Sequence, residues 1–212
     1  MAEGGDVTDN IKGNESLAMK TKMSISDRIS TAENYKQDGN KCYKEKKYRA
    51  AIGKYHRGLL YLRELEDQRN RVASLIGGIP ESDGSNVTGL SEEQKQEASK
   101  VRMDLYNNLA ACLLQVSNPN YEKIIHYCDC VLSQQPDNVK ALYRRGMALY
   151  HTKAYDDSRD CLLQAKGLCT GKIDPNIKRY LEMCKEAIAK HEAQEKSIYR
   201  GMFDKFAEDK QE

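Results

Sequence analysis

The sequence predicts an all-α protein with three pairs of helices followed by one long helix. Apolar residues recur every three to four positions in each periodic segment, which is typical of amphipathic helices. Proline occurs only 4 times in 212 residues, and the helix-favouring Lys, Glu, Ala, Leu and Arg are abundant. In addition, small and aromatic residues return at the same offsets in three separate segments.

The composition changes along the chain and predicts its organisation. Residues 1–25 are polar and have no sustained period, so we expect them to be disordered. Residues 26–170 hold the three helix pairs. A flexible insert is expected at residues 67–90, where several glycines and a proline interrupt the pattern. Residues 171–212 are expected to form an extended C-terminal helix.

Capping signals mark where several helices begin. Ser91 and Gln94 form a capping-box pattern, with the Gln three residues after the Ser. Asp174 precedes Pro175, as expected for a cap followed by a proline in the first turn. The segments NPN, at residues 118–120, and PDN, at residues 136–138, separate the helices around them.

Three segments share one pattern of small and large residues. The first helix of each pair carries a small residue (Gly39, Ala110 or Gly146), with a large residue four positions earlier. The second helix starts with a tyrosine, and in the first and third pairs a small and then a large residue follow. These positions are Tyr48, Ala51 and Tyr55; Tyr121; and Tyr155, Ser158 and Leu162. This spacing is typical of a 34-residue helix–turn–helix repeat, whose small residues let the helices touch. An unrelated helical bundle is the alternative.

On these residues the chain resembles the tetratricopeptide repeats. The resemblance implies a right-handed superhelix in which the first helix of each pair lines a concave groove. The long C-terminal helix would cap the apolar end of the third repeat.

Five polar residues fall on the expected groove-lining helices. They are Lys36 and Asn40 at repeat positions 5 and 9, Asn108 at position 6, and Lys140 and Arg144 at positions 2 and 6. Here the chain is similar to tetratricopeptide domains of the carboxylate-clamp type, found in chaperone-binding co-chaperones and in the large immunophilins. In that family these positions hold Lys, Asn, Asn, Lys and Arg and bind the carboxylates of a peptide ending in Glu-Glu-Val-Asp. All five types match.

The residue types suit this role. Lys and Arg form charge-assisted hydrogen bonds with carboxylates, and Arg can do so through two parallel bonds. Asn adds neutral donors that orient a ligand without repulsion. The alternative is that Lys36, Lys140 and Arg144 only solvate helix faces. We expect no internal partner for the Arg144 guanidinium, and therefore expect Arg144→Ala to leave folding nearly intact.

The C-terminal segment KSIYRGMFDKFAED carries an apolar stripe on a charged helix. It resembles the segment that closes the large immunophilins. The stripe either docks on the third repeat or stands ready for a partner; its members are Tyr199, Met202, Phe203 and Phe206.

Over roughly residues 28–206 the order of motifs is similar to the tetratricopeptide repeat protein 9 family. No prolyl isomerase domain is expected ahead of the repeats, because about 30 residues are too few to form one.

Charge and cysteine usage narrow the class of function. The net charge of +2 does not indicate a nucleic-acid partner. No apolar run approaches the roughly 20 residues of a membrane span, and the 7 scattered cysteines are expected to be free thiols in a cytoplasmic protein. Cys128 and Cys130 lie two positions apart and should face different sides of a helix, so we expect no metal. We also expect no cofactor, because Gly77, Gly78 and Gly84 do not form a phosphate-binding loop.

No catalytic set of residues stands out, and the sequence therefore predicts a protein that is not an enzyme. The expected function is a co-chaperone-like adaptor that binds the acidic C-terminus of a cytosolic heat-shock chaperone. The alternative is a scaffold for a different partner, such as a cytoskeletal protein, in which the clamp is not used for chaperones.

Overall fold

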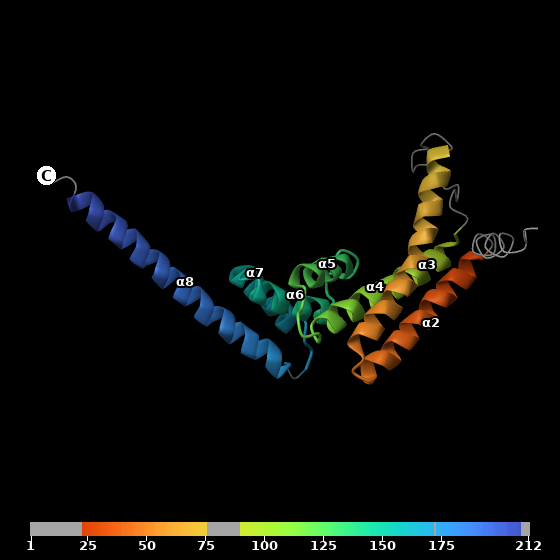
Figure 1. Cartoon of the computed structure of the whole chain (residues 1–212), viewed down its shortest axis with the longest axis horizontal. Helices are drawn as coiled ribbons and strands as arrows, with labels where there is room; N and C mark the ends of the chain where they lie inside the picture. Colours follow the sequence, from red (N-terminus) through yellow and green to blue (C-terminus); the bar gives the residue numbers. More distant parts are fainter. Residues whose placement is uncertain (1–22, 76–89, 172, 209–212) are drawn as a thin grey trace, which may run out of the picture. The chain divides into compact units, whose positions relative to one another are not determined.

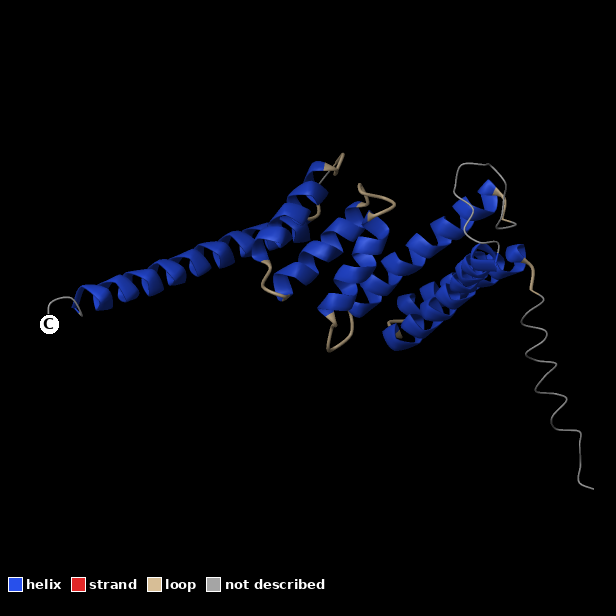
Figure 2. Cartoon of the chain, turned by 90° about the horizontal axis from the view of Figure 1, so that it is seen from above, coloured by secondary structure: helices blue, strands red, loops and turns tan. Residues whose placement is uncertain are grey.

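The computed structural model describes residues 23–75, 90–171 and 173–208, and every regular element in these ranges is a helix (Figures 1 and 2). The described helices are α2 (Ile25–Lys44), α3 (Tyr48–Leu75), α4 (Glu92–Leu113), α5 (Tyr121–Leu132), α6 (Val139–His151), α7 (Tyr155–Gly167) and α8 (Pro175–Glu208). They belong to two compact units, Met1–Leu105 and Tyr106–Glu212, and α4 runs from the first unit into the second.

The predicted helix starts are confirmed. The backbone N–H of Gln94 donates to Ser91 Oγ, and the backbone N–H of Ser91 donates to Gln94 Oε1, at 3.2 and 3.0 Å. The side chains of Asn120 and Asn138 each accept a backbone N–H in the first turn of α5 and α6. Asp174 does the same ahead of α8. These contacts satisfy N–H groups that have no partner inside the helix.

Part of the expected insert is helical. We expected residues 67–90 to form a flexible insert, but α3 continues to Leu75. Residues 67–75 contain neither glycine nor proline, so an established helix can extend through them at little cost. The rest of the expected insert, residues 76–89, lies outside the described residues, as do residues 1–22 of the expected N-terminal disordered segment.

In the first unit, α2 and α3 pack together at a glycine. A side chain at Gly39 would overlap the ring of Tyr55, which is 1% exposed. A Cβ at Gly58 of α3 would lie 3.2 Å from both the carbonyl oxygen of Ala32 in α2 and the Leu105 side chain in α4. Small residues therefore allow the close helix contacts that the repeat pattern predicted.

The second unit shows the same contact between α6 and α7. A Cβ at Gly146 would lie 2.7 Å from Leu162 Cγ. The buried Ser158 hydroxyl donates to the carbonyl oxygen of Gly146 at 2.7 Å. Leu162 in turn packs against Tyr180 and Cys184 of α8. The first part of the C-terminal helix thus covers the apolar side of the third helix pair.

The turns of the first and third helix pairs have the same geometry. Lys46 and Lys153 each follow the pair's glycine by seven positions, and both have positive φ angles, 60° and 67°. The N–H of each donates to the carbonyl oxygen three residues earlier, in Tyr43 and Tyr150. A left-handed conformation is uncommon for lysine. The shared geometry is structural evidence for an internal repeat.

The outer part of α8 is exposed. All described side chains at positions 189–202 are exposed, whereas Ile177, Tyr180 and Cys184 nearer its start are buried. In the part of the chain that the structure describes, no helix combines the length and apolar character required to cross a membrane.

We predict that Gly146→Ala lowers the free energy of unfolding by about 1–3 kcal/mol, because the new methyl group overpacks the α6–α7 contact. Gly53→Ala is the matched control, since a Cβ there meets nothing within 4 Å. It should raise stability by up to about 1 kcal/mol through helix propensity. Denaturant unfolding measures both. Equal effects at the two sites would contradict the proposed close contact.

We also predict that deleting residues 196–212 changes the melting temperature by less than about 2 °C, because the described side chains in this segment, at positions 196–202, are exposed and such side chains contribute little to stability. Differential scanning calorimetry measures this. A larger decrease would show that the terminal stripe is held against the rest of the chain.

Candidate functional site

Lys36 is held by two carboxylates of its own unit. Its Nζ lies 2.9 Å from Asp104 Oδ2 and 2.9 Å from Glu33 Oε2, and the Lys36 side chain is only 16% exposed. Burial lowers the pKa of Lys36, but the hydrogen bonds and charges of Asp104 and Glu33 outweigh this effect and hold it above its usual 10.5. Lys36 therefore stays protonated with internal partners.

Asn40 lies one turn after Lys36 on α2 and is oriented by α3. The hydroxyl of the buried Tyr55 donates to Asn40 Oδ1 at 2.8 Å. Gly39, the residue that makes room for the Tyr55 ring, immediately precedes Asn40. The packing of the helix pair thus fixes the side chain of the adjacent polar residue.

In the second unit, Arg144 is part of a hydrogen-bond chain. Its Nη1 donates to Asn107 Oδ1 of α4, and Asn107 Nδ2 donates to Asn138 Oδ1 at 3.3 Å. Asn138 Oδ1 also accepts the Ala141 N–H and caps α6. The expectation that the Arg144 guanidinium has no internal partner is therefore wrong. This prediction failed because Asn107 lies 37 positions from Arg144 in the sequence.

The neighbouring arginine is held by a different set of groups. Arg145 Nε lies 2.7 Å from Asp129 Oδ1, and Arg145 Nη1 lies 2.7 Å from Cys161 Sγ. These contacts join α6 to α5 and α7 within the second unit. The repeat pattern selected Arg144 rather than Arg145 as the ligand-binding arginine, and the two residues do contact different elements.

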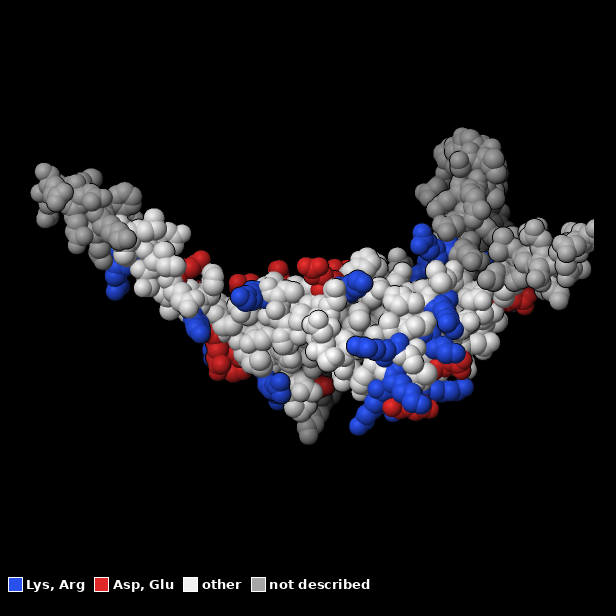
Figure 3. Space-filling view, in the orientation of Figure 1, with Lys and Arg blue, Asp and Glu red and all other residues white. Residues whose placement is uncertain are grey.

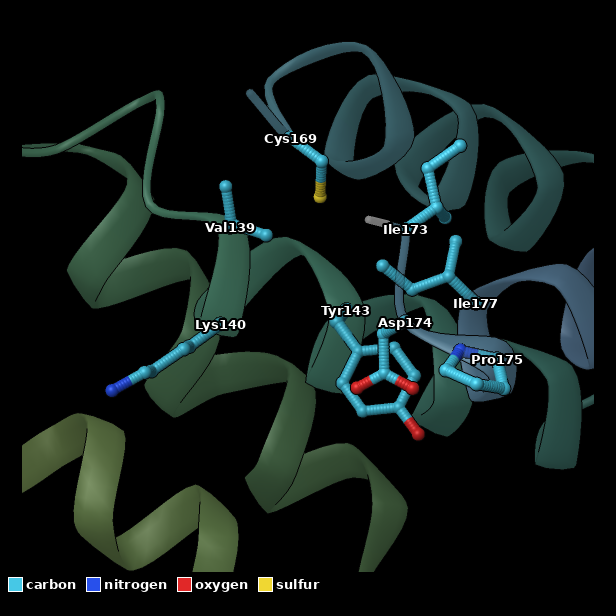
Figure 4. A pocket seen from close by; sticks show the side chains of 8 residues that line it. All are labelled: Val139, Lys140, Tyr143, Cys169, Ile173, Asp174, Pro175 and Ile177. Carbon is cyan, nitrogen blue, oxygen red and sulfur yellow. The ribbon is translucent and has the colours of Figure 1, made fainter. Parts of the chain in front are cut away.

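Lys140 is exposed at the start of α6, and Asn108 is half-buried on α4. The structure gives Lys140 no ion pair with any of the described residues. Lys140 lines one side of a pocket of about 480 Å³, and Figure 4 shows its ammonium directed away from the other labelled side chains. The other lining residues are Val139, Tyr143, Cys169, Ile173, Asp174, Pro175 and Ile177. This pocket is mostly apolar, and the Asp174 carboxylate is among the groups that line it.

The predicted residues are thus distributed over both units. Lys36 and Asn40 lie on α2 of the first unit, while Asn108, Lys140 and Arg144 lie on α4 and α6 of the second. Four polar partners of these residues were not predicted from the sequence, namely Glu33, Asp104, Asn107 and Asn138. Of these, the Glu33–Lys36 pair has a sequence signal, because residues three apart meet on a helix face.

The terminal stripe is only partly described. Tyr199 is 58% exposed and Met202 is 48% exposed. Ile198, which we did not include in the stripe, is 63% exposed beside them. The side chains of Phe203 and Phe206 lie outside the described residues.

The described residues contain no group of three or more His, Cys, Asp or Glu side chains arranged to hold a metal ion. Cys128 is buried and Cys130 is half-buried, so the two do face different environments, with Cys130 Sγ 3.8 Å from His126 Nε2. Burial raises the pKa of Cys112 and of Cys128 to about 12. Both thiols are therefore protonated near neutral pH.

Acidic and basic side chains lie next to one another on the face shown in Figure 3. The exposed pairs include Lys41 with Asp38, Lys95 with Glu92 and Arg159 with Asp156, at 3.3, 2.6 and 3.0 Å. Because such pairs are exposed, each contributes little to stability.

The chain is similar to known proteins over most of its length. It is 41% identical over 172 residues to tetratricopeptide repeat protein 9C from Xenopus tropicalis, covering 81% of this chain and 92% of that protein. No model of a protein family matches the chain.

Solved structures show the same fold. The C-terminal TPR-containing domain of an FK506-binding protein from Plasmodium falciparum superimposes with a TM-score of 0.65 at 21% identity. That match covers 82% of this chain and 98% of the domain. The first TPR domain of Spaghetti, bound to the HSP90 peptide SRMEEVD, gives a TM-score of 0.52 at 17% identity, with 76% and 94% covered. The predicted fold class, an all-α tetratricopeptide fold with a long C-terminal helix, is confirmed.

We predict that Asp104→Asn lowers the free energy of unfolding by about 0.5–1 kcal/mol at pH 7, a modest value because Asp104 is 46% exposed to solvent. The pKa of Lys36 is raised by folding, so the stability from this pair is fully present below about 10.5 and lost as the pH rises further. The difference between wild type and variant should therefore persist to about pH 10 and shrink above it.

Denaturant unfolding between pH 7 and 11.5 measures this difference. Glu182→Gln is the control, because its partner Lys185 is exposed on the surface of α8. It should cause little change at any pH. A difference for Asp104→Asn that does not decrease above pH 10.5 would mean that Lys36 is not its source.

Proposed function

The chain belongs to the tetratricopeptide repeat protein 9 family, and on this basis we propose that it is a non-catalytic adaptor that binds the acidic C-terminus of a cytosolic heat-shock chaperone. The family match covers a helical repeat fold used for protein interaction. The proposed ligand-binding residues are Lys36, Asn40, Asn108, Lys140 and Arg144. Such an adaptor would act in the cytoplasm and would need no cofactor.

The observation that carries this proposal is the pair of cations on α6. Lys140 and Arg144 lie four positions apart, which places them one turn apart on the same helix face. Lys140 is exposed and Arg144 is half-buried. An exposed ammonium and a held guanidinium can bind carboxylates with charge-assisted hydrogen bonds, while Asn107 keeps the guanidinium in place. A solved protein of the same fold holds the acidic peptide SRMEEVD, which makes this peptide a suitable probe.

A second candidate function rests on a different observation. The large apolar side chains of Ile198, Tyr199 and Met202 are exposed on the outer part of α8. An exposed apolar cluster is typical of a protein-binding surface. The alternative is therefore a scaffold that binds a different partner, such as a cytoskeletal protein, with the clamp residues not used for chaperones.

We predict that the free-acid peptide SRMEEVD binds with a Kd on the order of micromolar, or about −8 kcal/mol. Affinity should fall as salt concentration rises, because the attraction is ionic. Arg144→Ala should weaken binding by about 1.5–3 kcal/mol, the range for hydrogen bonds to charged groups. Because Arg144 also bonds Asn107, this variant should lose some stability as well. Isothermal titration calorimetry measures the affinities.

Lys140→Ala is the cleaner variant, since Lys140 is exposed and its loss should leave folding intact. Lys185→Ala removes an equal charge from exposed α8 and should bind as wild type does. Amidating the peptide's C-terminus should weaken binding by an amount comparable to Arg144→Ala. If free-acid and amidated peptides bind equally well, or if Lys140→Ala and Lys185→Ala behave alike, the clamp proposal is wrong.

A further inference from the structure

We propose that Asp104 and Glu33 act as built-in competitors for Lys36, so that the chain's own carboxylates limit how tightly an acidic ligand binds there. This inference rests on the proposed function and assigns a role to two residues outside the predicted ligand-binding set.

The contacts around Lys36 already resemble those of a bound ligand. Both carboxylates lie at 2.9 Å from the same Nζ, one from α2 and one from α4. A lysine ammonium has three N–H donors, and these two contacts use two of them. An incoming carboxylate therefore finds one remaining donor, or must displace Asp104 or Glu33 to gain another.

The charges around Lys36 also oppose a ligand. One positive charge is paired with two negative charges, so Lys36, Glu33 and Asp104 together carry a net charge of −1. A third carboxylate brought to Lys36 would be repelled by the two that are present. The repulsion is stronger than on an open surface because the Lys36 side chain is mostly shielded from water.

The two carboxylates can nevertheless be displaced. The Asp104 side chain is 46% exposed and the Glu33 side chain is 33% exposed, so each can turn towards water and recover its hydration. Weakly held, half-exposed ion pairs of this kind contribute little free energy. The competitors therefore reduce affinity by a moderate factor and do not block Lys36.

Asp104 is the better residue to change because it comes from a different helix than Lys36. Glu33 and Lys36 are three residues apart on α2 and would remain neighbours in any state of that helix. Asp104→Asn keeps the size of the side chain and its oxygen acceptor and removes only the charge. Glu33→Gln is the second variant and changes the other competitor in the same way.

The test is a calorimetric titration of the free-acid peptide SRMEEVD into wild type and Asp104→Asn. We expect the variant to bind about two- to fivefold more tightly, a factor that corresponds to the loss of a half-exposed ion pair. The same substitution is expected to lower stability, so binding and stability should move in opposite directions. Glu33→Gln should also bind more tightly than wild type.

Two controls separate this effect from a change in overall charge. Glu92→Gln makes the same change about 18 Å away on α4, at a residue paired with Lys95, and should leave affinity unchanged. In a Lys36→Ala background, Asp104→Asn should give no gain, because the competition acts through Lys36. A gain of equal size in that background would overturn the proposal.

The outcomes distinguish this inference from the function on which it rests. If wild type binds the peptide and Asp104→Asn binds it equally or more weakly, the competition is refuted while the clamp stands. If only the Asp104 and Glu33 variants bind measurably, the competition is confirmed in its strongest form. If neither wild type nor either variant binds, the proposed function is refuted, and this inference with it.

Discussion

The close approach of two helices at a glycine determines both the packing of a helix pair and the orientation of the polar residue beside it. On α2, Gly39 leaves space for the Tyr55 ring, which is almost completely buried. The same ring carries the hydroxyl that donates to Asn40 Oδ1 at 2.8 Å. On α6, Gly146 contacts Leu162 while the preceding Arg145 contacts Cys161 and Asp129. In both pairs the glycine at the helix contact is next to a polar residue in the sequence. Helix packing therefore also fixes where that polar side chain lies.

Of the predicted ligand-binding cations, Lys36 and Arg144 both have internal partners, and these partners differ in the charge that they add beside the cation. Lys36 contacts two carboxylates, which compensate its positive charge and add one negative charge to its surroundings. Arg144 contacts the side-chain amide of Asn107, which orients the guanidinium and contributes no charge to that contact. A neutral acceptor can hold a cation in position without competing for an anionic ligand, whereas a carboxylate does both. Positions that look equivalent in the repeat pattern can therefore have unequal affinity for the same ligand.

The features that the sequence predicted are those encoded in short-range patterns. The helical period, the capping contacts at Ser91, Asn138 and Asp174, and the small residue in each helix pair depend on residues close together in the chain. The extension of α3 to Leu75 was also predictable, because residues 67–75 lack glycine and proline. These residues were instead assigned to the flexible insert because glycines follow them.

The features that escaped prediction depend on contacts made only in the folded chain. Asp104 is 68 positions from Lys36, and no local pattern brings them together. The left-handed conformation of Lys46 and Lys153 was not predictable from the sequence either, because a turn of this geometry is expected to carry glycine or asparagine. In both turns the N–H of the following residue donates five positions back, to Cys42 and Leu149, and the packed helices on either side hold the lysine in place.

The chain offers two kinds of candidate binding surface, and they differ in their physical response to salt. Contacts of Lys140 and Arg144 with carboxylates are weakened as ions screen the charges. Burial of Ile198, Tyr199 and Met202 removes apolar area from water and is strengthened by salts that are excluded from protein surfaces, such as sulfate. A partner that dissociates as sulfate is added is therefore held mainly by the cations, and a partner retained under the same conditions is held mainly by the apolar side chains of α8. Since the two surfaces lie on different helices, one molecule can use both, and the salt dependence of each partner then identifies the surface that binds it.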